Sequence, residues 1–286
     1  MLDGPENKTD FVVNGVARSV SIKNTPLFQY GDDEFLSSET TDITYAQPWY
    51  DQGFAEVDFL NQIEFSTLKN GLEQSIKRIA IQETGSDLEG FDLQNYHNFV
   101  EDDETHFKIV SRTRDLFPAD FNFPIDTLIP RLGEILGIAL TDIDPRTQNR
   151  LHIIVRINRP GSNDYNPPHK DIYEGVDNFS YIAPLVNFWI PIAGANANSN
   201  LAIVPGSHKI NENQILRTHD GGVMQGNQYR VRMIKSWAGQ NSLTRSQAKY
   251  GQVLIFSSHL IHGLGINDNE DQTRIALEFR LFKKPI

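Results

Sequence analysis

Two short motifs about ninety residues apart hold side chains that could bind a metal ion. In the first, residues 168–171, His169 stands two positions before Asp171, and the second begins with His262. Two imidazoles and one carboxylate are a ligand set that occupies one face of the octahedron around Fe(II) and leaves three positions open for reactants. Arg274 follows the second motif and could clamp a carboxylate bidentately. Together these residues indicate an oxygenase that depends on iron and 2-oxoglutarate.

The spacing of His169 and Asp171 suits chelation if the chain is extended there. In extended chain, residues two apart point the same way, with backbones roughly 6–7 Å apart. Pro167 and Pro168 favour extended or polyproline structure in this segment. With 8 His and 37 Asp plus Glu in 286 residues, however, one His-x-acidic triplet is expected by chance. The motif alone is therefore weak, and its alternative interpretation is a solvated histidine in a polar loop.

The second motif lies between two expected strands. Residues 251–256 form a short apolar run that opens with glycine, which is typical of a buried strand. Residues 273–282 alternate, with Ile275, Leu277, Phe279 and Leu281 on one face and Arg274, Ala276, Glu278 and Arg280 on the other. His262 and Arg274 are thus expected on neighbouring strands. The alternative for Arg274 is a surface charge on an edge strand.

The order of these motifs resembles the phytanoyl-CoA dioxygenase family. After the His-x-Asp motif come Trp-Ile-Pro-Ile at 189–192, Leu-Ala-Ile-Val-Pro-Gly-Ser-His-Lys at 201–209, and His-Gly at 262–263 with Asn267 and Arg274. The resemblance covers roughly residues 150–282. It implies a double-stranded β-helix core, Fe(II), and the cosubstrates 2-oxoglutarate and O2.

Carried over position by position, the resemblance implies a role for five residues. His169, Asp171 and His262 would bind iron. Arg274 would pair with the distal carboxylate of 2-oxoglutarate, and Trp189 would lie near this cosubstrate. A large aromatic residue of the core is an equally good interpretation of Trp189. A cupin-like metal enzyme that does not use 2-oxoglutarate, and a binding module without catalysis, remain as alternatives.

Four residues complicate this assignment. Lys170 stands where a neutral residue is frequent in the family, and Leu264 where a small hydroxyl residue might contact the cosubstrate. His259 is a rival to His262, which is preferred because Gly263, Asn267 and Arg274 keep the family spacing from it. His208 belongs to the Pro-Gly-Ser-His-Lys turn and is interpreted as structural.

Composition excludes several classes of protein. A net charge of −11 and a pI near 5.2 argue against nucleic acid or an anionic membrane as partner. No run approaches the ~20 apolar residues of a membrane span, and the first residues lack a secretory signal. The chain has no cysteine, which excludes disulfides and thiolate metal sites. We expect a cytoplasmic enzyme acting on a small molecule, of unknown oligomeric state.

The elements expected along the chain form a single β-rich α+β domain, 1–286, with a jelly-roll, cupin-like core. Residues 1–150 supply a mainly helical wrap, with a polar stretch to about residue 52 and helices near 58–82, 93–116 and 128–140. Residues 151–286 form the core. Its expected strands are 152–158, 184–192, 201–204, 229–234, 251–257 and 274–282, without helices between them, which indicates antiparallel pairing. Arg156 and Asn158 share one face of the expected strand 152–158, and this face points either into the barrel mouth or to the surface.

The insertion 206–250 is long enough to be a functional lid. It has seven basic residues against two acidic ones, although the whole chain is acidic. This local excess, which includes Arg230 and Arg232, favours an anionic substrate; the alternative is a solvated loop whose charges pair elsewhere. The polar segment 160–180 also favours a small polar metabolite or a sugar-containing natural product over a fatty acyl chain.

Overall fold

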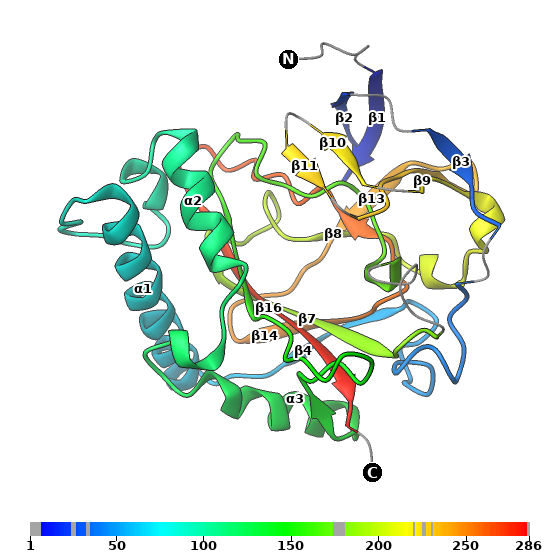
Figure 1. The fold of residues 1–286 in the computed structure, drawn as a ribbon, viewed down its shortest axis with the longest axis horizontal. Coiled ribbons are helices and arrows are strands. Elements are labelled where there is room, and N and C mark those ends of the chain that lie inside the picture. Colours follow the sequence, from blue (N-terminus) through cyan, green and yellow to red (C-terminus); the bar gives the residue numbers. More distant parts are fainter. Residues whose placement is uncertain are drawn as a thin grey trace.

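The chain folds into two facing β-sheets, with helices packed on the outer side of one of them (Figure 1). The computed structural model describes residues 7–23, 27–32, 35–173, 181–219, 221–224, 227–229 and 231–284. No described helix is both long and apolar enough to cross a membrane.

One sheet has six strands, and its longest strand carries Arg274 at its first position. The strands are β4 (Phe54–Asp58), β5 (Leu140–Thr141), β6 (Ile154–Asn158), β7 (Leu185–Ala193), β14 (Gln252–Ser257) and β16 (Arg274–Lys283). They run in the order β4-β14-β7-β16-β5, and β6 also pairs with β16. All these pairings are antiparallel, as the absence of intervening helices in the sequence indicated.

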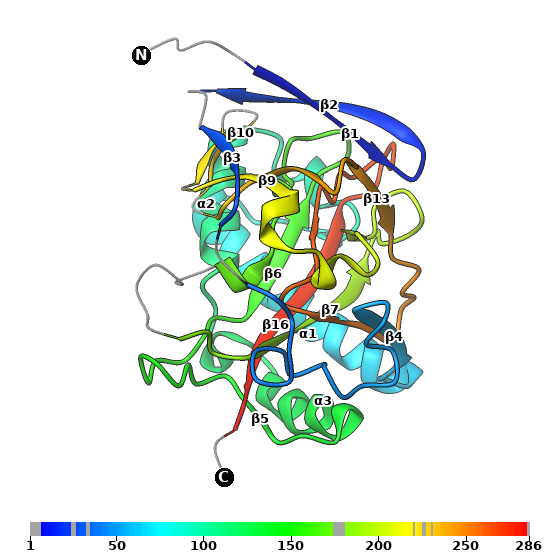
Figure 2. The ribbon, with the colours of Figure 1, turned by 90° about the vertical axis from the view of Figure 1, so that its right-hand side faces the viewer.

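The opposing sheet is built from short strands and an N-terminal hairpin. Its strands are β1 (Asn7–Val13), β2 (Val16–Lys23), β8 (Ala202–Ile203), β10 (Gly222–Met224), β11 (Asn227–Tyr229), β13 (Ser242–Arg245) and β15 (His262–Gly263). A three-stranded sheet adds β3 (Phe28–Tyr30), β9 (Ile215–Thr218) and β12 (Ile234–Trp237). The β1–β2 hairpin lies at the edge of the molecule where the N-terminus emerges (Figure 2).

The connections between the two sheets define a double-stranded β-helix. Four strands of the six-stranded sheet, β6-β16-β7-β14, face a row formed by residue 169, β15, β8 and β13. Residue 169 belongs to this row because His169 and His262 form an antiparallel bridge. Apart from the step from β8 to β13, successive core elements along the chain alternate between the sheets. The expected jelly-roll core is confirmed.

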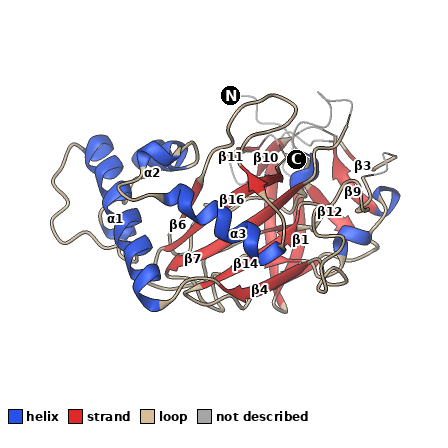
Figure 3. Cartoon of the chain, turned by 90° about the horizontal axis from the view of Figure 1, so that it is seen from below, coloured by secondary structure: helices blue, strands red, loops and turns tan. Residues whose placement is uncertain are grey.

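Three helices cover the outer face of the six-stranded sheet: α1 (Gln62–Thr84), α2 (Asp103–Thr113) and α3 (Leu128–Leu136) (Figures 1 and 3). Short 3-10 helices also occur: η1 (Tyr96–Asn98), η2 (Pro118–Asp120), η3 (Ile125–Thr127), η4 (Asp171–Tyr173), η6 (Ser207–Lys209) and η7 (Glu212–Gln214). One apolar cluster joins the helices to the sheet, with Leu72 and Ile109 against Ile275, Leu277 and Phe279. The alternation read from residues 273–282 is therefore the alternation between this core and the barrel interior.

The helix boundaries follow from capping groups. Helix α1 starts at Gln62 rather than near 58, since the Asn61 side chain accepts from the backbone N–H groups of Ile63 and Glu64 in a capping box. The stretch expected as a helix at 93–116 is divided, and α2 begins only after the cap at Asp102. Helix α3 ends at Leu136 because Gly137 adopts a left-handed φ of 68°.

The structure differs from the expected strands in two places. The strand expected at 229–234 is wrong, because Tyr229 ends β11 and Ile234 begins β12. The polar N-terminal stretch contains the regular β1–β2 hairpin, which the sequence analysis did not predict. Asn14 and Gly15, with φ of 49° and 78°, form the turn, and an Asn-Gly pair between apolar residues is a sequence pattern that indicates such a hairpin.

Candidate active site

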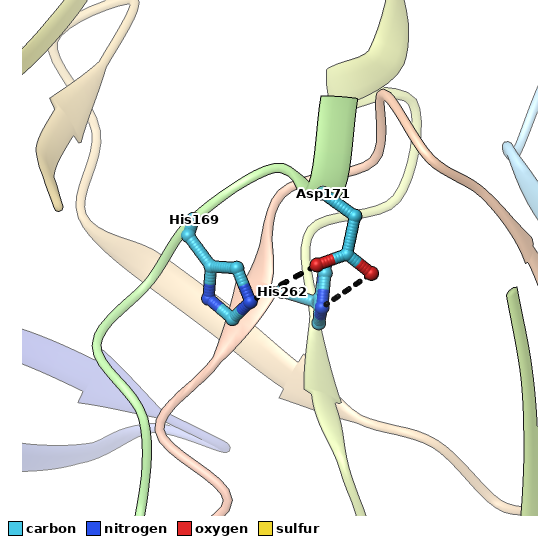
Figure 4. A group of neighbouring side chains, drawn as sticks. All are labelled: His169, Asp171 and His262. Atoms are coloured by element: carbon cyan, nitrogen blue, oxygen red, sulfur yellow. Dashed lines mark ion pairs between the residues drawn. The ribbon is translucent and has the colours of Figure 1, made fainter. Parts of the chain in front are cut away.

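His169, Asp171 and His262 come together inside the barrel (Figure 4). One ligand atom from each lies within 4.8 Å of the other two. The Nε2 atom of His169 is 3.3 Å from Oδ1 of Asp171, and Nε2 of His262 is 3.8 Å from Oδ2. All three side chains line one pocket. Residues separated by about ninety positions are thus placed where one cation could contact all of them.

Backbone hydrogen bonds hold the two histidines in matching positions. The His169 N–H donates to the carbonyl of His262 at 2.9 Å, and the His262 N–H donates to the carbonyl of His169 at 3.0 Å. Each Nδ1 faces a carbonyl two residues back, that of Pro167 at 2.7 Å and that of Leu260 at 3.0 Å. With Nδ1 donating, the Nε2 lone pair of both rings is directed to the shared centre, as in histidines that bind metals.

The charges of the three groups also suit a cation. Burial, together with the nearby His169, lowers the pKa of His262 to about 4. Burial by itself would raise the pKa of Asp171, but His262 and His169 outweigh it and hold this pKa well below its usual range. At neutral pH the site therefore offers a neutral imidazole at His262 and an ionised carboxylate, the protonation states that bind metals.

Gly263 allows the two motifs to approach each other. Its φ is 142°, and a Cβ atom there would lie 2.3 Å from the carbonyl oxygen of Pro167. We expect Gly263→Ala to lower the free energy of unfolding by about 1–3 kcal/mol and to weaken metal binding, because the backbone before His169 must move. The measurements are thermal unfolding and Fe(II) titration.

Gly161→Ala is the matched control for this substitution. Gly161 also has a positive φ, 62°, but nothing lies within 4 Å of its Cβ position. The Gly161→Ala substitution therefore introduces backbone strain without a steric clash. Equal iron affinity and equal stability in the two variants would contradict the close-approach argument.

Arg274 lines the same pocket as the three proposed metal ligands. It is 3% exposed, and its Nη2 donates to Oδ1 of Asn158 and, at 3.2 Å, to the carbonyl of Gly265. Its Nε and Nη1 are buried and have no hydrogen-bond partner among the described residues. Burial lowers the pKa of Arg274 to about 9, so it stays charged at neutral pH. A buried cation with two unused donors suits an anionic ligand.

Trp189 is buried against Arg274 rather than at the metal-binding group. It is 1% exposed, and the guanidinium carbon of Arg274 lies 5.9 Å from the centre of its ring. This distance permits a cation–π contact. Trp189 thus packs in the core and also borders the arginine.

The rival residues lie elsewhere. Both ring nitrogens of His259 face backbone carbonyls, those of Phe35 and Thr41, at 3.0 and 3.2 Å, so this histidine is outside the group. His208 is fully buried, with its ring 4.8 Å from that of Tyr50. The choice of His262 over His259 therefore agrees with the geometry.

Lys170 points away from the pocket into a buried charged cluster. Its Nζ donates to Oε1 of Glu212 at 3.0 Å, and Arg217 donates from Nε to Oε2 at 2.8 Å. The Tyr173 hydroxyl donates to Oε2 at 2.8 Å. Glu212 thus ties the segment between the two ligands of the first motif to the insertion.

We expect Glu212→Ala to lower the free energy of unfolding by about 3–5 kcal/mol, because Lys170 and Arg217 would lose their buried counter-charge. Glu212→Gln keeps the size of the side chain and one accepting oxygen but loses the charge and the second acceptor, so its effect should fall between. Urea unfolding measures both. Glu104→Ala, which removes the exposed ion pair of Glu104 with Lys108, is the control and should leave the midpoint nearly unchanged. A midpoint for Glu212→Ala equal to that of the control would refute the prediction.

The segment 206–250 was expected as a lid, but it is built into the sheets. None of its described residues lines the pocket. Several of its basic side chains have internal partners: Arg217 pairs with Glu212, Arg245 with Asp268 at 2.8 Å, and Lys209 with Asp51 at 3.0 Å. Arg230 lies outside the described residues. In the described part of the segment, the basic excess thus serves the fold and gives no support for attraction of an anionic substrate.

The pocket contains polar residues beyond those expected to act. They are Arg156 and Asn158 of β6, Asn187 of β7, and Glu278 and Arg280 of β16. Arg156 and Asn158 point into the barrel, which decides between the two orientations left open. Asn187 was missed, although it precedes Trp189 by two residues and shares its face of the strand.

The chain was compared with a family model and with curated proteins. The sequence model of the phytanoyl-CoA dioxygenase family (PhyH) matches residues 51–276. No curated protein matches the chain.

Three solved structures are similar over most of the chain. EvdMO1 is 18% identical, with a TM-score of 0.46, over 85% of this chain and 50% of its own. AviO1 from Streptomyces viridochromogenes Tue57 is 17% identical (TM-score 0.45) over 87% of this chain and 99% of its own. The non-heme alpha ketoglutarate dependent carbocyclase SnoK from nogalamycin biosynthesis is 14% identical (TM-score 0.44) over 88% and 87%. The chain thus spans about half the length of EvdMO1.

Proposed function

Because the chain belongs to the phytanoyl-CoA dioxygenase family, we propose that it is an oxygenase that uses Fe(II) and 2-oxoglutarate to hydroxylate a C–H bond of a small molecule. The observation that carries the proposal is the convergence of His169, Asp171 and His262 in one buried pocket that also contains Arg274.

The donor set fits ferrous iron. Two imidazole nitrogens and one carboxylate form the facial triad of non-heme iron oxygenases. Such a triad would leave the remaining positions on the metal open for reactants. Iron bound with 2-oxoglutarate supplies the activation of O2 and the oxidation of the C–H bond. In this proposal His169, Asp171 and His262 hold the metal, and their hydrogen bonds to Pro167 and Leu260 hold the rings in position.

Arg274 fits the distal carboxylate of 2-oxoglutarate. Its Nε and Nη1 are buried at the pocket and have no partner among the residues that the structure describes, and a charge-assisted pair would satisfy them. Asn158 holds the guanidinium through Nη2, and Trp189 packs beside it. We therefore propose that Arg274 binds the cosubstrate, and that Asn158 and Trp189 position Arg274.

The substrate is proposed to be a small polar or anionic metabolite or a sugar-containing natural product. Polar side chains of β6, β7 and β16 line the pocket, which suits a hydrogen-bonding molecule better than a fatty acyl chain. The helices and the barrel share one apolar cluster, in support of a single domain.

The proposal is tested by titrating Fe(II) into the metal-free protein without O2, in the presence of 2-oxoglutarate. A weak visible charge-transfer band is expected when 2-oxoglutarate chelates the iron. Binding of iron without the band would exclude 2-oxoglutarate as cosubstrate and favour a cupin-like metal enzyme. Failure to bind iron at all would refute the oxygenase proposal and favour a binding module.

A further inference from the structure

The pocket has two cationic ends on the inward face of β16. Arg274 lies at one end and Arg280 at the other, and both line the pocket. They are six positions apart in extended strand, about 20 Å between Cα atoms at ~3.3 Å per residue. Between them, Glu278 accepts from Nε of Arg156 at 2.9 Å, which leaves an internal ion pair in the middle. A five-carbon dicarboxylate that joins the metal to Arg274 is too short to occupy the Arg280 end as well.

Asn187 lies at the Arg280 end and has unused hydrogen-bonding capacity. It is directly opposite Arg280 in the β7–β16 ladder, and side chains in such pairs are in contact range. Asn187 is 2% exposed, and neither Oδ1 nor Nδ2 has a hydrogen-bond partner among the described residues. Buried amides are nearly always paired, and an unpaired one lowers stability. A ligand in the pocket would supply the missing partners.

This end of the pocket is also next to the proposed iron ligands. Phe256 is opposite Asn187 in the β7–β14 ladder, and its ring centre is 4.9 Å from that of His262. Arg280 lines the same pocket as Asp171 and His262. A molecule held by Arg280 and Asn187 would therefore lie beside the metal.

We propose that Arg280 and Asn187 form the binding subsite for the substrate, and that the substrate presents a carboxylate to them. The Arg280 guanidinium pairs with the carboxylate, Nδ2 of Asn187 donates to it, and Oδ1 accepts from a hydroxyl or amine on the adjacent carbon. The inference rests on the proposed function, which assigns the Arg274 end to 2-oxoglutarate.

The test uses acetate as probe and the intact protein loaded with Fe(II) and saturated with 2-oxoglutarate, without O2. Paramagnetic iron should speed relaxation of the acetate methyl protons, which gives a dissociation constant for acetate. We expect this constant to rise about tenfold or more in Arg280→Met, since hydrogen bonds to charged groups are at stake. Asn187→Leu should raise it severalfold. Arg112→Met, at an exposed arginine paired with Glu83, is the control and should match the wild type.

Further measurements separate binding from a structural role. Asn187→Leu replaces an unpartnered amide by an apolar side chain of similar size, so the melting temperature should stay the same or rise. A lower melting temperature with unchanged acetate affinity would show that Asn187 is structural and overturn the subsite. Acetamide, which lacks the charge, should bind more weakly than acetate to the wild type and equally to wild type and Arg280→Met.

Three outcomes distinguish this inference from the proposed function. A normal charge-transfer band with equal acetate affinity in all variants would overturn the subsite and leave the oxygenase proposal intact. Loss of the acetate effect on addition of 2-oxoglutarate would place acetate in the cosubstrate site and would also overturn the subsite. Absence of the band in the wild type would instead overturn the proposed function, and the inference with it.

Discussion

Asp171→Ala is expected to abolish 2-oxoglutarate turnover and to weaken Fe(II) binding by more than about 100-fold, since even outer partners of metal ligands are worth about 10–100-fold. The substitution removes the only carboxylate of the group and leaves two imidazoles. Those two still define a partial site, but they cannot complete the facial triad. Fe(II) titration without O2 measures the binding, and succinate formation in air measures the turnover.

Two histidine variants serve as controls for this experiment. His152→Ala removes a half-exposed histidine outside the pocket and should leave iron affinity unchanged. His259→Gln removes the rival ligand and should bind iron normally if the protein folds, because both ring nitrogens already face carbonyls. Substantial turnover by Asp171→Ala, or loss of iron in a folded His259→Gln, would contradict the assignment of the ligands.

Arg274→Ala is expected to raise the 2-oxoglutarate requirement about 30-fold or more, because truncating one partner of a buried charge pair costs about 2–5 kcal/mol and each ~1.4 kcal/mol is tenfold. Fe(II) affinity without 2-oxoglutarate should stay the same, since Arg274 is not among the metal-binding group. Titration of the visible band with 2-oxoglutarate gives the change in affinity. Arg274→Lys keeps the charge but not the planar fork, so it should recover only part of the loss.

A matched ligand isolates the carboxylate contact. 2-Oxovalerate has the same five-carbon chain and the same chelating end, but it lacks the distal carboxylate. The wild type should bind it far more weakly than 2-oxoglutarate, and Arg274→Ala should bind the two alike. A preference for 2-oxoglutarate that survives in the variant would mean that another residue holds the carboxylate.

Much of the architecture could be predicted because local patterns dominate it. The alternation of residues 273–282 places Arg274 and Glu278 in the barrel and Ile275 and Leu277 in the helix-covered core, and β16 follows it. Period and apolar length also located β7, β14 and α1, with errors of a few residues at the ends. Those errors arise because caps and pairing partners set the boundaries: Phe59 and Leu60 donate to Gly251 before the cap at Asn61 begins α1.

Tertiary context decides the features that spacing along the chain does not indicate. The long, basic segment 206–250 favours a lid by its sequence, and in the structure its strand β13 lies between β1 and β8 in the opposing sheet. Its charges bind other parts of the chain, as Arg245 does with Asp268. Neither the pairing partner of a short strand nor the partner of a charge is encoded in spacing along the chain.

The sequence by itself determined the chemistry that is available: two imidazoles, one carboxylate and an arginine, in an order and spacing that match a family of oxygenases. These features are local, because strand alternation and motif spacing follow from the chain geometry of a few residues. Only the tertiary structure decided which groups share the pocket. It separated His262 from His259, turned Lys170 toward Glu212, and placed the amide of Asn187 opposite Arg280. Burial and the meeting of distant strands produced these contacts, and both depend on the whole fold.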